Sequence, residues 1–311
     1  MTEARGVFWL YALLGLLGAS VTGLALFAAT ANVRWDTPSL AALVAACRSF
    51  ALPNATATSV LALILGSGAF AVIALAARSA VRQLVASQRY LRQLEVVGRA
   101  PYGTPQTFIY RDDAPQAFCV GLLRPRIFVS TATLDVLKED EFEAVLAHES
   151  HHARCRDPLR LLLARTVSDA LFFLPGMREI ASRYAALAEV AADGAAVRAN
   201  GGSRQSLAAA LLAFESAASP AVVGIAPERV DSLLGDRPAW ELPLALIASA
   251  LVILTAVGVV AVRVAEASAH SQLNLPVFLA NACMLAMAVV PLVVGATALL
   301  RSGRLLRMRT R

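Results

Sequence analysis

Long apolar runs alternate with one extended polar segment along this chain. Four runs, at residues 7–29, 59–77, 243–262 and 276–300, have about the 20 residues that an α-helix needs to cross a bilayer. The first run is longer than the roughly 7–15-residue core of a signal peptide, and no A-x-A-like cleavage site follows it directly. The pattern therefore predicts a multi-pass α-helical membrane protein with four retained spans.

The segment between the second and third runs, residues 78–242, is polar enough to fold in water. Its first stretch has apolar residues at helical spacing between arginines, which predicts an amphipathic helix that leaves the second span along the membrane surface. An ordinary helix packed on the rest of this segment explains the pattern equally well. The apolar positions of the stretch are Val81, Leu84, Val85, Leu91 and Leu94.

A small sheet is expected next in the polar segment. A Pro/Gly-rich stretch at Pro101–Pro105 precedes three short runs with strand-like composition, Thr107–Tyr110, Ala117–Val120 and Arg126–Ser130. Residues 121–125 would form the turn between the last two runs.

The rest of the polar segment has helical spacing, so the predicted domain is α+β, mostly helical with a small sheet. Thr131 or Thr133 can cap a helix that carries several acidic residues in its first turn. Asp157 followed by proline is a good start for a second helix that runs to about Phe173. The last two predicted helices are Met177–Ala199, which stops at Asn200-Gly201-Gly202, and Ser203–Ser216.

The composition agrees with a membrane protein. Hydrophobic residues make up 58% of the chain and charged residues 16%, and the mean hydropathy is +0.62, which excludes a disordered, collagen-like or purely soluble chain. The net charge of +6 comes mainly from arginines beside the apolar runs rather than from an aromatic-interleaved stripe, so we expect no direct nucleic-acid binding. The four cysteines form no CxxC pair, which argues against a disulfide framework and a cysteine-based zinc site.

The arginines near the ends of the apolar runs predict the orientation of the protein in the cell membrane, because cytoplasmic loops carry an excess of basic residues. Twelve lie on the side of the termini and three on the opposite side. We therefore expect both termini and the domain at 78–242 in the cytoplasm, between two spans in residues 1–77 and two spans plus a basic tail in 243–311. The twelve are Arg5, Arg78, Arg82, Arg89, Arg92, Arg229, Arg237, Arg301, Arg304, Arg307, Arg309 and Arg311, and the three are Arg34, Arg48 and Arg263.

Three of the four histidines fall within the five residues His148–His152, which form an H-E-x-x-H motif. Residues i and i+4 lie one above the other on a helix, so the His148 and His152 imidazoles can both reach one tetrahedral zinc ion. Glu149 lies beside them as the candidate catalytic base for water. His151 is expected on the surface or in support of a ligand. A metal-free histidine cluster is the alternative interpretation.

A catalytic zinc site needs a third protein ligand, and the remaining histidine, His270, falls in a predicted outer loop. A carboxylate on another helix is therefore expected. Glu189 is the best candidate, because it stands among alanines and valines where an unpaired charge would be costly; Asp169 and Glu179 are weaker ones. Asp193, one turn later, can accept the free N–H of a ligating histidine. The alternative for Glu189 and Asp193 is two solvated carboxylates on a helix face.

These residues lie in a stretch, Ala117–Val197, that resembles the BlaR/MecR-type integral-membrane zinc peptidases. Residues 117–130 are similar to the strand pair ahead of that family's active-site helix, and residues 146–157 to its extended zinc motif, with an aspartate five residues after the second ligand. Phe172–Pro175 and Glu189–Asp193 are similar to its downstream landmarks. The resemblance implies one zinc ion as cofactor, with His148, His152 and Glu189 as its ligands, Glu149 as the base and Asp193 behind a ligand.

The resemblance also implies a zincin-like metalloprotease domain of the gluzincin type, inserted between membrane spans and facing the cytoplasm. In the best-known members its activity leads to cleavage of a winged-helix repressor. Those receptors carry an extracellular penicillin-binding sensor, which needs an S-x-x-K serine, but the single lysine here, Lys138, has Asp135 three residues before it. Direct β-lactam sensing is therefore excluded, and we expect a partner sensor protein to supply the stimulus.

The sequence thus predicts a membrane-embedded zinc endopeptidase that cleaves a cytoplasmic or membrane-proximal protein, such as a transcriptional repressor in regulatory proteolysis. An extended substrate is expected to add as a strand beside Arg126–Ser130, and the basic tail at 301–311 to rest on anionic lipid of the bilayer. A CAAX-endopeptidase or HtpX-type quality-control or processing protease is an alternative. Another is a non-enzymatic signalling scaffold with a zinc-stabilised domain.

Overall fold

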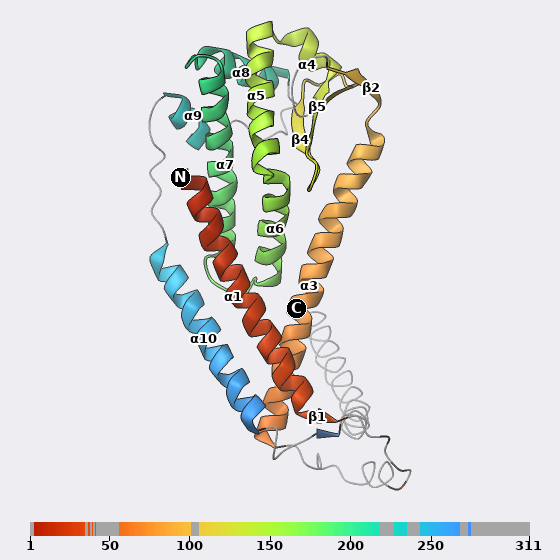
Figure 1. Ribbon diagram of the computed structural model, residues 1–311, viewed down its shortest axis with the longest axis vertical. Helices are drawn as coiled ribbons and strands as arrows, with labels where there is room; N and C mark the ends of the chain where they lie inside the picture. Colours follow the sequence, from red (N-terminus) through yellow and green to blue (C-terminus); the bar gives the residue numbers. More distant parts are fainter. Residues whose placement is uncertain are drawn as a thin grey trace, which may run out of the picture. The chain divides into compact units, whose positions relative to one another are not determined.

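Helices make up most of the computed structural model of this protein, together with a four-stranded and a two-stranded sheet (Figure 1). The structure describes residues 3–34, 37, 39, 41, 56–100, 106–217, 227–234, 243–267 and 273–274. The chain divides into two compact units. The first contains Met1–Ala19 and Val72–Leu254, and the second contains Ser20–Ala71 and Thr255–Arg311.

Three helices are long and apolar enough to cross a membrane, judged by their length and composition. They are α1 (Glu3–Ala31), α3 (Ala57–Gln93) and α10 (Leu244–Ala267), and they coincide with the first three predicted spans. The fourth predicted span, at 276–300, and the basic tail lie outside the described residues, as does the stretch Pro101–Pro105.

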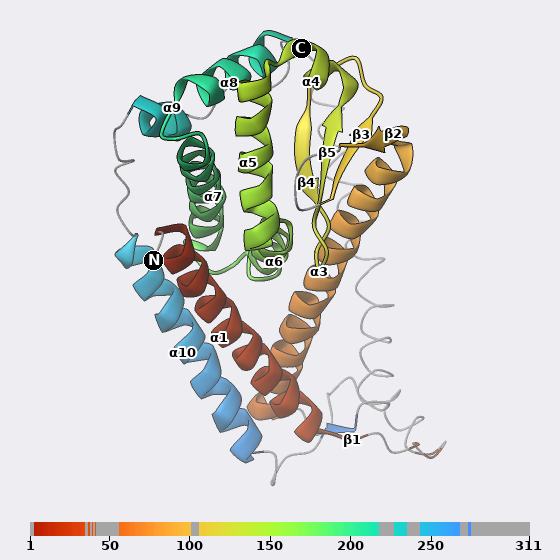
Figure 2. The ribbon, with the colours of Figure 1, turned by 45° about the horizontal axis from the view of Figure 1, so that its top comes forward.

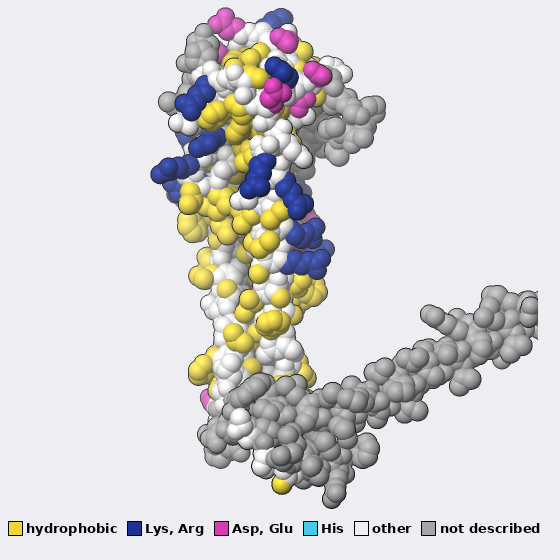
Figure 3. Space-filling view, turned by 90° about the vertical axis from the view of Figure 1, so that its right-hand side faces the viewer, with side chains coloured by type: hydrophobic (Ala, Val, Ile, Leu, Met, Phe, Trp, Pro, Cys, Tyr) yellow, Lys and Arg dark blue, Asp and Glu magenta, His cyan; other side chains and the backbone are white. Residues whose placement is uncertain are grey.

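The amphipathic stretch after the second predicted span is part of the same helix, because α3 continues without a break to Gln93. Ser79 Oγ donates to Asp169 Oδ2 at 2.6 Å, and Gln83 Nε2 donates to Thr166 Oγ1 at 3.2 Å. These bonds fix the stretch to α6 (Asp157–Ala170), as the interpretation of an ordinary packed helix requires. Figure 3, which shows the side of the molecule where α3 lies, has basic side chains gathered above a stretch covered by apolar ones.

The second unit is held by small residues on three helices. Its core contains Ala25 and Ala28 of α1, Ala62 and Ala69 of α3, and Ala261 and Val264 of α10. Small side chains let helix backbones approach closely, which favours association of apolar helices. The buried Asn32 donates to the carbonyl oxygens of Ala28 and Val264 and so closes the end of α1. Strands β1 (Val33–Arg34) and β6 (Leu273–Asn274) pair in parallel.

The four-stranded sheet of the first unit has the order β2-β3-β5-β4. Its strands β3 (Thr107–Tyr110), β4 (Ala117–Val120) and β5 (Arg126–Ser130) have the predicted bounds, whereas β2 (Val96–Arg99) was not predicted. The β3–β5 pair is parallel and the other two pairs are antiparallel. Gly121 begins the β4–β5 turn with a φ of +112°, a conformation that suits glycine.

The sheet order corrects the predicted docking of a substrate strand beside β5. Since β5 has β3 on one side and β4 on the other, neither of its edges is free, and the edge strand of this half of the sheet is β4. The prediction failed because the sequence of the strands does not reveal that β3 and β5 are neighbours in the sheet, although β4 lies between them in the sequence.

Six helices complete the first unit, and their starts differ in part from the predictions. Ser130 rather than a threonine caps the short α4, and α5 begins only at Glu139, where the Glu141 side chain accepts from the Lys138 N–H. Asp157 is the first residue of α6, after Arg156 in a left-handed conformation. The helices are α4 (Thr131–Val136), α5 (Glu139–Cys155), α6 (Asp157–Ala170), α7 (Met177–Ala199), α8 (Gln205–Ala217) and α9 (Pro227–Leu234).

Helix α5 lies between α7 and the sheet, and α8 crosses near its N-terminal end (Figure 2). Ala144 of α5, Ala196 of α7 and Leu207 of α8 form one buried cluster. Val145 of α5 and Ala210 of α8 form a second with Leu137. Packing on several sides therefore holds α5, the helix that carries the H-E-x-x-H motif, in the middle of this unit.

The first turns of α1 also belong to this unit, where they pack on α6. Tyr11 donates to the Ala164 carbonyl oxygen, and its hydroxyl also lies 2.8 Å from Ser168 Oγ. A Cβ atom at Gly18 would come within 2.5 Å of the Leu171 side chain, so α1 lies close to the end of α6 there. The N-terminal apolar helix is therefore a structural part of the unit that contains the motif.

Candidate metal centre and active site

The motif residues of α5 form the base of the site. His148, Glu149 and His152 are all buried, with 7–8% of their surface exposed. The two histidines are one turn apart on the same helix face, and their Nε2 atoms lie 3.1 Å from each other. Two imidazole nitrogens directed at one point need a shared proton or a cation between them, because two lone pairs repel.

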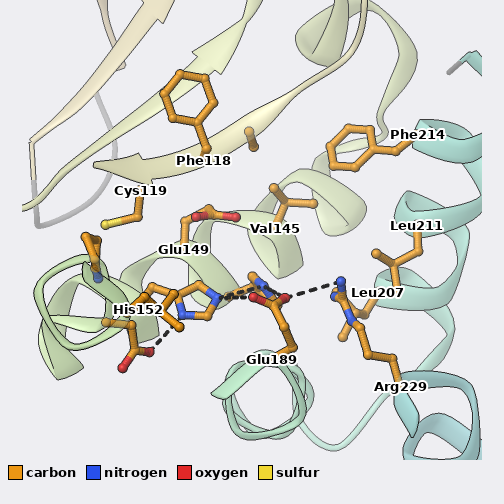
Figure 4. A pocket seen from close by; sticks show the side chains of 15 residues that line it. Phe118, Cys119, Val145, Glu149, His152, Glu189, Leu207, Leu211, Phe214 and Arg229 are labelled. Atoms are coloured by element: carbon orange, nitrogen blue, oxygen red, sulfur yellow. Dashed lines mark hydrogen bonds and ion pairs between the residues drawn. The ribbon is translucent and has the colours of Figure 1, made fainter. Parts of the chain in front are cut away.

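Glu189 of α7 completes a group of three potential ligands (Figure 4). Its Oε2 lies 3.5 Å from His148 Nε2, and its Oε1 lies 3.5 Å from His152 Nε2. The ligand atoms of these three residues all lie within 4.8 Å of one another. Two imidazoles and one carboxylate are a donor set used by catalytic zinc sites, so the residues fit a metal ion.

Buried carboxylates hold the far side of each imidazole ring. His152 Nδ1 lies 2.8 Å from Asp157 Oδ2, and His148 Nδ1 lies 2.9 Å from Asp193 Oδ1, although the second contact is poorly aligned for a hydrogen bond. Asp157 and Asp193 are only 3% and 1% exposed. A proton held at Nδ1 leaves each Nε2 free as a ligand, as is usual for metal-binding histidines.

The sequence predicted Asp157 as the start of a helix and placed it in the extended zinc motif, without assigning its side chain a role. Its carboxylate instead accepts from Tyr184 and faces His152 at the same time. The signal for this role was its position five residues after His152, in the stretch similar to the extended zinc motif.

A ring contact links Tyr184 to the N-terminal helix. The Phe8 ring of α1 lies 5.2 Å from the Tyr184 ring, centroid to centroid. The Arg160 guanidinium lies 5.1 Å from the centre of the same Phe8 ring and 3.8 Å from Asp157. Phe8, Tyr184 and Asp157 thus form a continuous series of contacts that ends at His152.

Arg229 of α9 is a site residue that the sequence did not reveal, since it was predicted only as a basic flank of the third span. Its Nε and Nη2 donate to the two carboxylate oxygens of Asp193 at 2.8 and 2.7 Å. Its Nη1 lies 3.3 Å from Glu189 Oε2. Arg229 therefore holds both carboxylates of α7 in place, as a bidentate guanidinium pair does well.

The site shifts the pKa values of its acids and of His148. Burial raises the pKa of the Glu149 carboxyl, which strengthens it as a base. Burial acts to lower the pKa of His148, but the Asp193 and Glu189 carboxylates outweigh it and raise the pKa to about 9. Burial also acts to raise the pKa of Glu189, yet His148, His152 and Arg229 hold it below the usual value. Glu189 is thus ionised at neutral pH, as a ligand for a cation must be.

A cavity of about 360 Å³ opens over this group. Glu149 lies between the three potential ligands and the edge strand β4 (Figure 4). Apolar side chains of α5 and α8 form another part of the wall. The lining residues include Ala117, Phe118 and Cys119 of β4, Val145 of α5, and Leu207, Leu211 and Phe214 of α8.

The other candidates from the sequence lie outside this cavity. Asp169 accepts from Ser79, and neither it nor Glu179 lines the cavity. His151 is half-buried, with its Nε2 3.4 Å from Cys155 Sγ, and it is not among the cavity-lining residues.

Several curated proteins are similar to part of this chain. It is 32% identical over 91 residues to a "Protease HtpX homolog" of Methylibium petroleiphilum, which covers 29% of this chain and 32% of that protein. It is 38% identical over 72 residues to "Protease HtpX homolog 2" of Methanosarcina mazei, covering 22% and 24%. It is 30% identical over 95 residues to a "Protease HtpX homolog" of Aquifex aeolicus, covering 30% and 32%. The matches thus span about a third or less of these relatives.

A family model matches a much larger part of the chain, residues 27–233, and its description is "BlaR1 peptidase M56". The matched range includes α5, the Glu189 and Asp193 positions of α7, and Arg229 of α9. A metallopeptidase family implies a metal, which agrees with the histidine and glutamate group described above. Because the match extends over more than half of the sequence, this chain belongs to the BlaR1 peptidase M56 family.

Proposed function

We propose that this protein is a membrane-embedded zinc endopeptidase with a zincin-like domain of the gluzincin type. The observation that carries the proposal is the convergence of His148, His152 and Glu189 beside the buried Glu149. A zinc ion held by these three side chains would supply a Lewis acid for the scissile carbonyl and for water.

Glu149 is the proposed general base and acid. Its carboxylate would accept a proton from the attacking water and then donate that proton to the leaving amine. The raised pKa suits both steps. It makes the carboxylate a stronger base toward water, and it keeps the carboxyl group protonated until the proton passes to the amine.

The edge of β4 is the proposed docking site for the substrate backbone. The Ser130 N–H donates to the Gln116 carbonyl oxygen at 2.9 Å, and Ala117 and Cys119 stand opposite Val129 and Ile127. Since hydrogen-bonded and non-bonded pairs alternate in an antiparallel ladder, the N–H and C=O of Ala117 and Cys119 face away from β5. An extended peptide could pair with these groups beside Glu149.

The proposed setting is a four-span protein in the cell membrane, with the protease domain at 78–242 and both termini in the cytoplasm. The excess of arginines on that side supports this orientation. The proposed substrate is a cytoplasmic or membrane-proximal protein, with a winged-helix repressor as the choice that the resemblance suggests. A separate sensor protein would provide the stimulus.

A quality-control or processing protease is the second candidate. Its support is the similarity to proteins named "Protease HtpX homolog". A non-enzymatic scaffold has less support, because a structural site needs no buried carboxylate beside its ligands, and Glu149 is such a carboxylate.

Replacement of Glu149 tests the proposed chemistry. Glu149→Gln keeps the shape of the side chain but removes the base, so the variant should retain its metal while cleavage falls by about 10²–10⁴-fold. The exposed Glu179→Gln on α7 is the matched control and should behave like the unchanged protein. Metal content of the purified proteins and new N-termini in the proteomes of expressing cells are the measurements.

The same experiment separates the candidate functions. Glu149-dependent new N-termini on a winged-helix protein would support the repressor substrate, and new N-termini on many membrane proteins would support quality control. Unchanged cleavage in the Glu149→Gln cells would exclude the proposed mechanism.

A further inference from the structure

A second cavity of about 920 Å³ lies between the last part of α3 and the helices α6 and α7. All of its described lining residues belong to the first compact unit. It is separate from the metal centre, because Leu161 is the one described residue that lines both cavities. None of the three potential metal ligands lines this second cavity.

The walls of this cavity are strongly basic. Arg82 and Arg89 of α3, Arg165 of α6 and Arg178 of α7 line it, against one acidic residue, Asp169. All four arginines are exposed, and none forms an ion pair with a carboxylate in the described part of the chain.

Ser79, Gln83 and Asp169 are already hydrogen-bonded, so the arginines are the charged groups that remain available to a ligand. Asp169 accepts from Ser79, and Gln83 donates to Ser79 at 3.1 Å and to Thr166. Asp169 thus accepts from a hydroxyl and forms no ion pair with the four guanidinium groups, which outnumber it. The cavity offers several forked donors from three helices to an anion, and a phosphate group is the anion that guanidinium geometry matches well.

The position of the cavity along α3 indicates where such a phosphate would come from. The apolar stretch of α3 ends at Ala77, and Arg82 follows five residues later, about 7.5 Å along the helix axis. The headgroup layer of a bilayer extends roughly 5–8 Å beyond the hydrocarbon on each side. Arg82 therefore stands at headgroup depth if α3 spans the membrane.

Exposed apolar side chains border the basic walls. Val81 and Val85 of α3 line the cavity and are 57% and 37% exposed. A free phosphate ion gains nothing from contact with apolar surface, whereas the acyl chains of a lipid can pack against it. Basic side chains beside apolar ones on this face are visible in Figure 3.

We propose that this cavity binds the phosphate headgroup of an anionic phospholipid, with Arg82, Arg165 and Arg178 as its main contacts. The acyl chains would lie along the exposed apolar side chains of α3. This lipid site is independent of the proposed proteolytic activity.

Binding of short-chain lipids to the full-length protein in a neutral detergent tests the site. The probes are dioctanoyl phosphatidylglycerol, dioctanoyl phosphatidylcholine and inorganic phosphate, with bound lipid measured by native mass spectrometry. The unchanged protein should bind phosphatidylglycerol at least about tenfold more tightly than phosphatidylcholine. The double variant Arg82→Gln/Arg165→Gln should weaken that binding about tenfold or more.

The matched control is Arg124→Gln/Arg198→Gln, which removes the same charge from exposed positions outside the cavity and should bind like the unchanged protein. Equal binding of the two lipids, or equal loss in both double variants, would overturn the proposal. Displacement of phosphatidylglycerol by phosphate at equal concentration would identify a free-anion site and would also overturn it. Where Arg82→Gln/Arg165→Gln fails to fold, Arg178→Gln takes its place with Arg198→Gln as its control, and equal binding by these two variants would overturn the proposal.

Discussion

Arg229 shows how one side chain far along the sequence can organise a candidate metal centre. It binds both oxygens of Asp193 and touches Glu189, so it fixes two carboxylates that face His148. Without it, Asp193 would be a buried carboxylate with its main cationic partner removed, which is a costly arrangement.

Replacement of Arg229 should therefore weaken the site without removing any ligand. We expect Arg229→Gln to lower metal affinity by about 10–100-fold, as changes behind ligating histidines commonly do. Arg229→Lys should recover part of the loss, because it restores the charge but not the bidentate geometry. Competition with a chelator measures the affinity, with the exposed Arg198→Gln as control; an unchanged affinity in Arg229→Gln would contradict the positioning role.

At this scale the sequence revealed the motif residues but only part of their surroundings. The spacing of His148 and His152 on one helix face needs no tertiary information. Glu189 was predicted from a charge among apolar neighbours and Asp193 from its place one turn later, and the family resemblance supported both. Arg229 could not be found this way, because it approaches Asp193 from another helix and belongs to no local pattern. Asp157 carried a signal in the extended motif, but its position at a helix start offered a simpler explanation.

The edge strand β4 lines the cavity and is the proposed docking site for the substrate backbone. Its Cys119 backbone N–H faces the free edge, so it can be removed without loss of a β4–β5 hydrogen bond.

Cys119→Pro should accordingly reduce kcat/KM by about 2–10-fold, the effect of one lost hydrogen bond to the substrate. Cys119→Ala retains the N–H and is the control for the lost thiol. Thermal unfolding of both variants would show whether the fold survives the proline. Equal activity of the two folded variants would argue that substrates bind without this edge.

Elements with strong local signals were predicted well, and weak ones were missed. The strands β3, β4 and β5 and the helix α7 have their predicted bounds. Strand β2 includes Gly98, which weakens a strand signal, and its register with β3 is irregular. Helix α9 has only eight residues and lies between stretches that contain glycine and proline, so its helical spacing gave no clear signal. The place of β5 inside the sheet is a matter of tertiary pairing, which strand runs alone do not determine.

On the scale of the whole molecule, the arginine distribution predicts which side of the membrane each part occupies. In a background without the four native cysteines, we expect Arg198→Cys on α7 to react with an impermeant maleimide only after the cells are permeabilised. Thr37→Cys, beyond α1, should react in intact cells. Both sites are exposed, so access rather than burial decides the labelling. The reverse result would place the protease domain outside the cytoplasm.

The contact of Phe8 with Tyr184 has a consequence for how a signal could arrive. Tyr184 donates to Asp157, and Asp157 faces His152, so a rotation of the N-terminal helix about its axis would alter the surroundings of the His152 imidazole through three side chains. No flexible loop intervenes in this route. A receptor that rotated this helix within the lipid would therefore change the contacts around a proposed zinc ligand, and a fragment without the helix would lose this route.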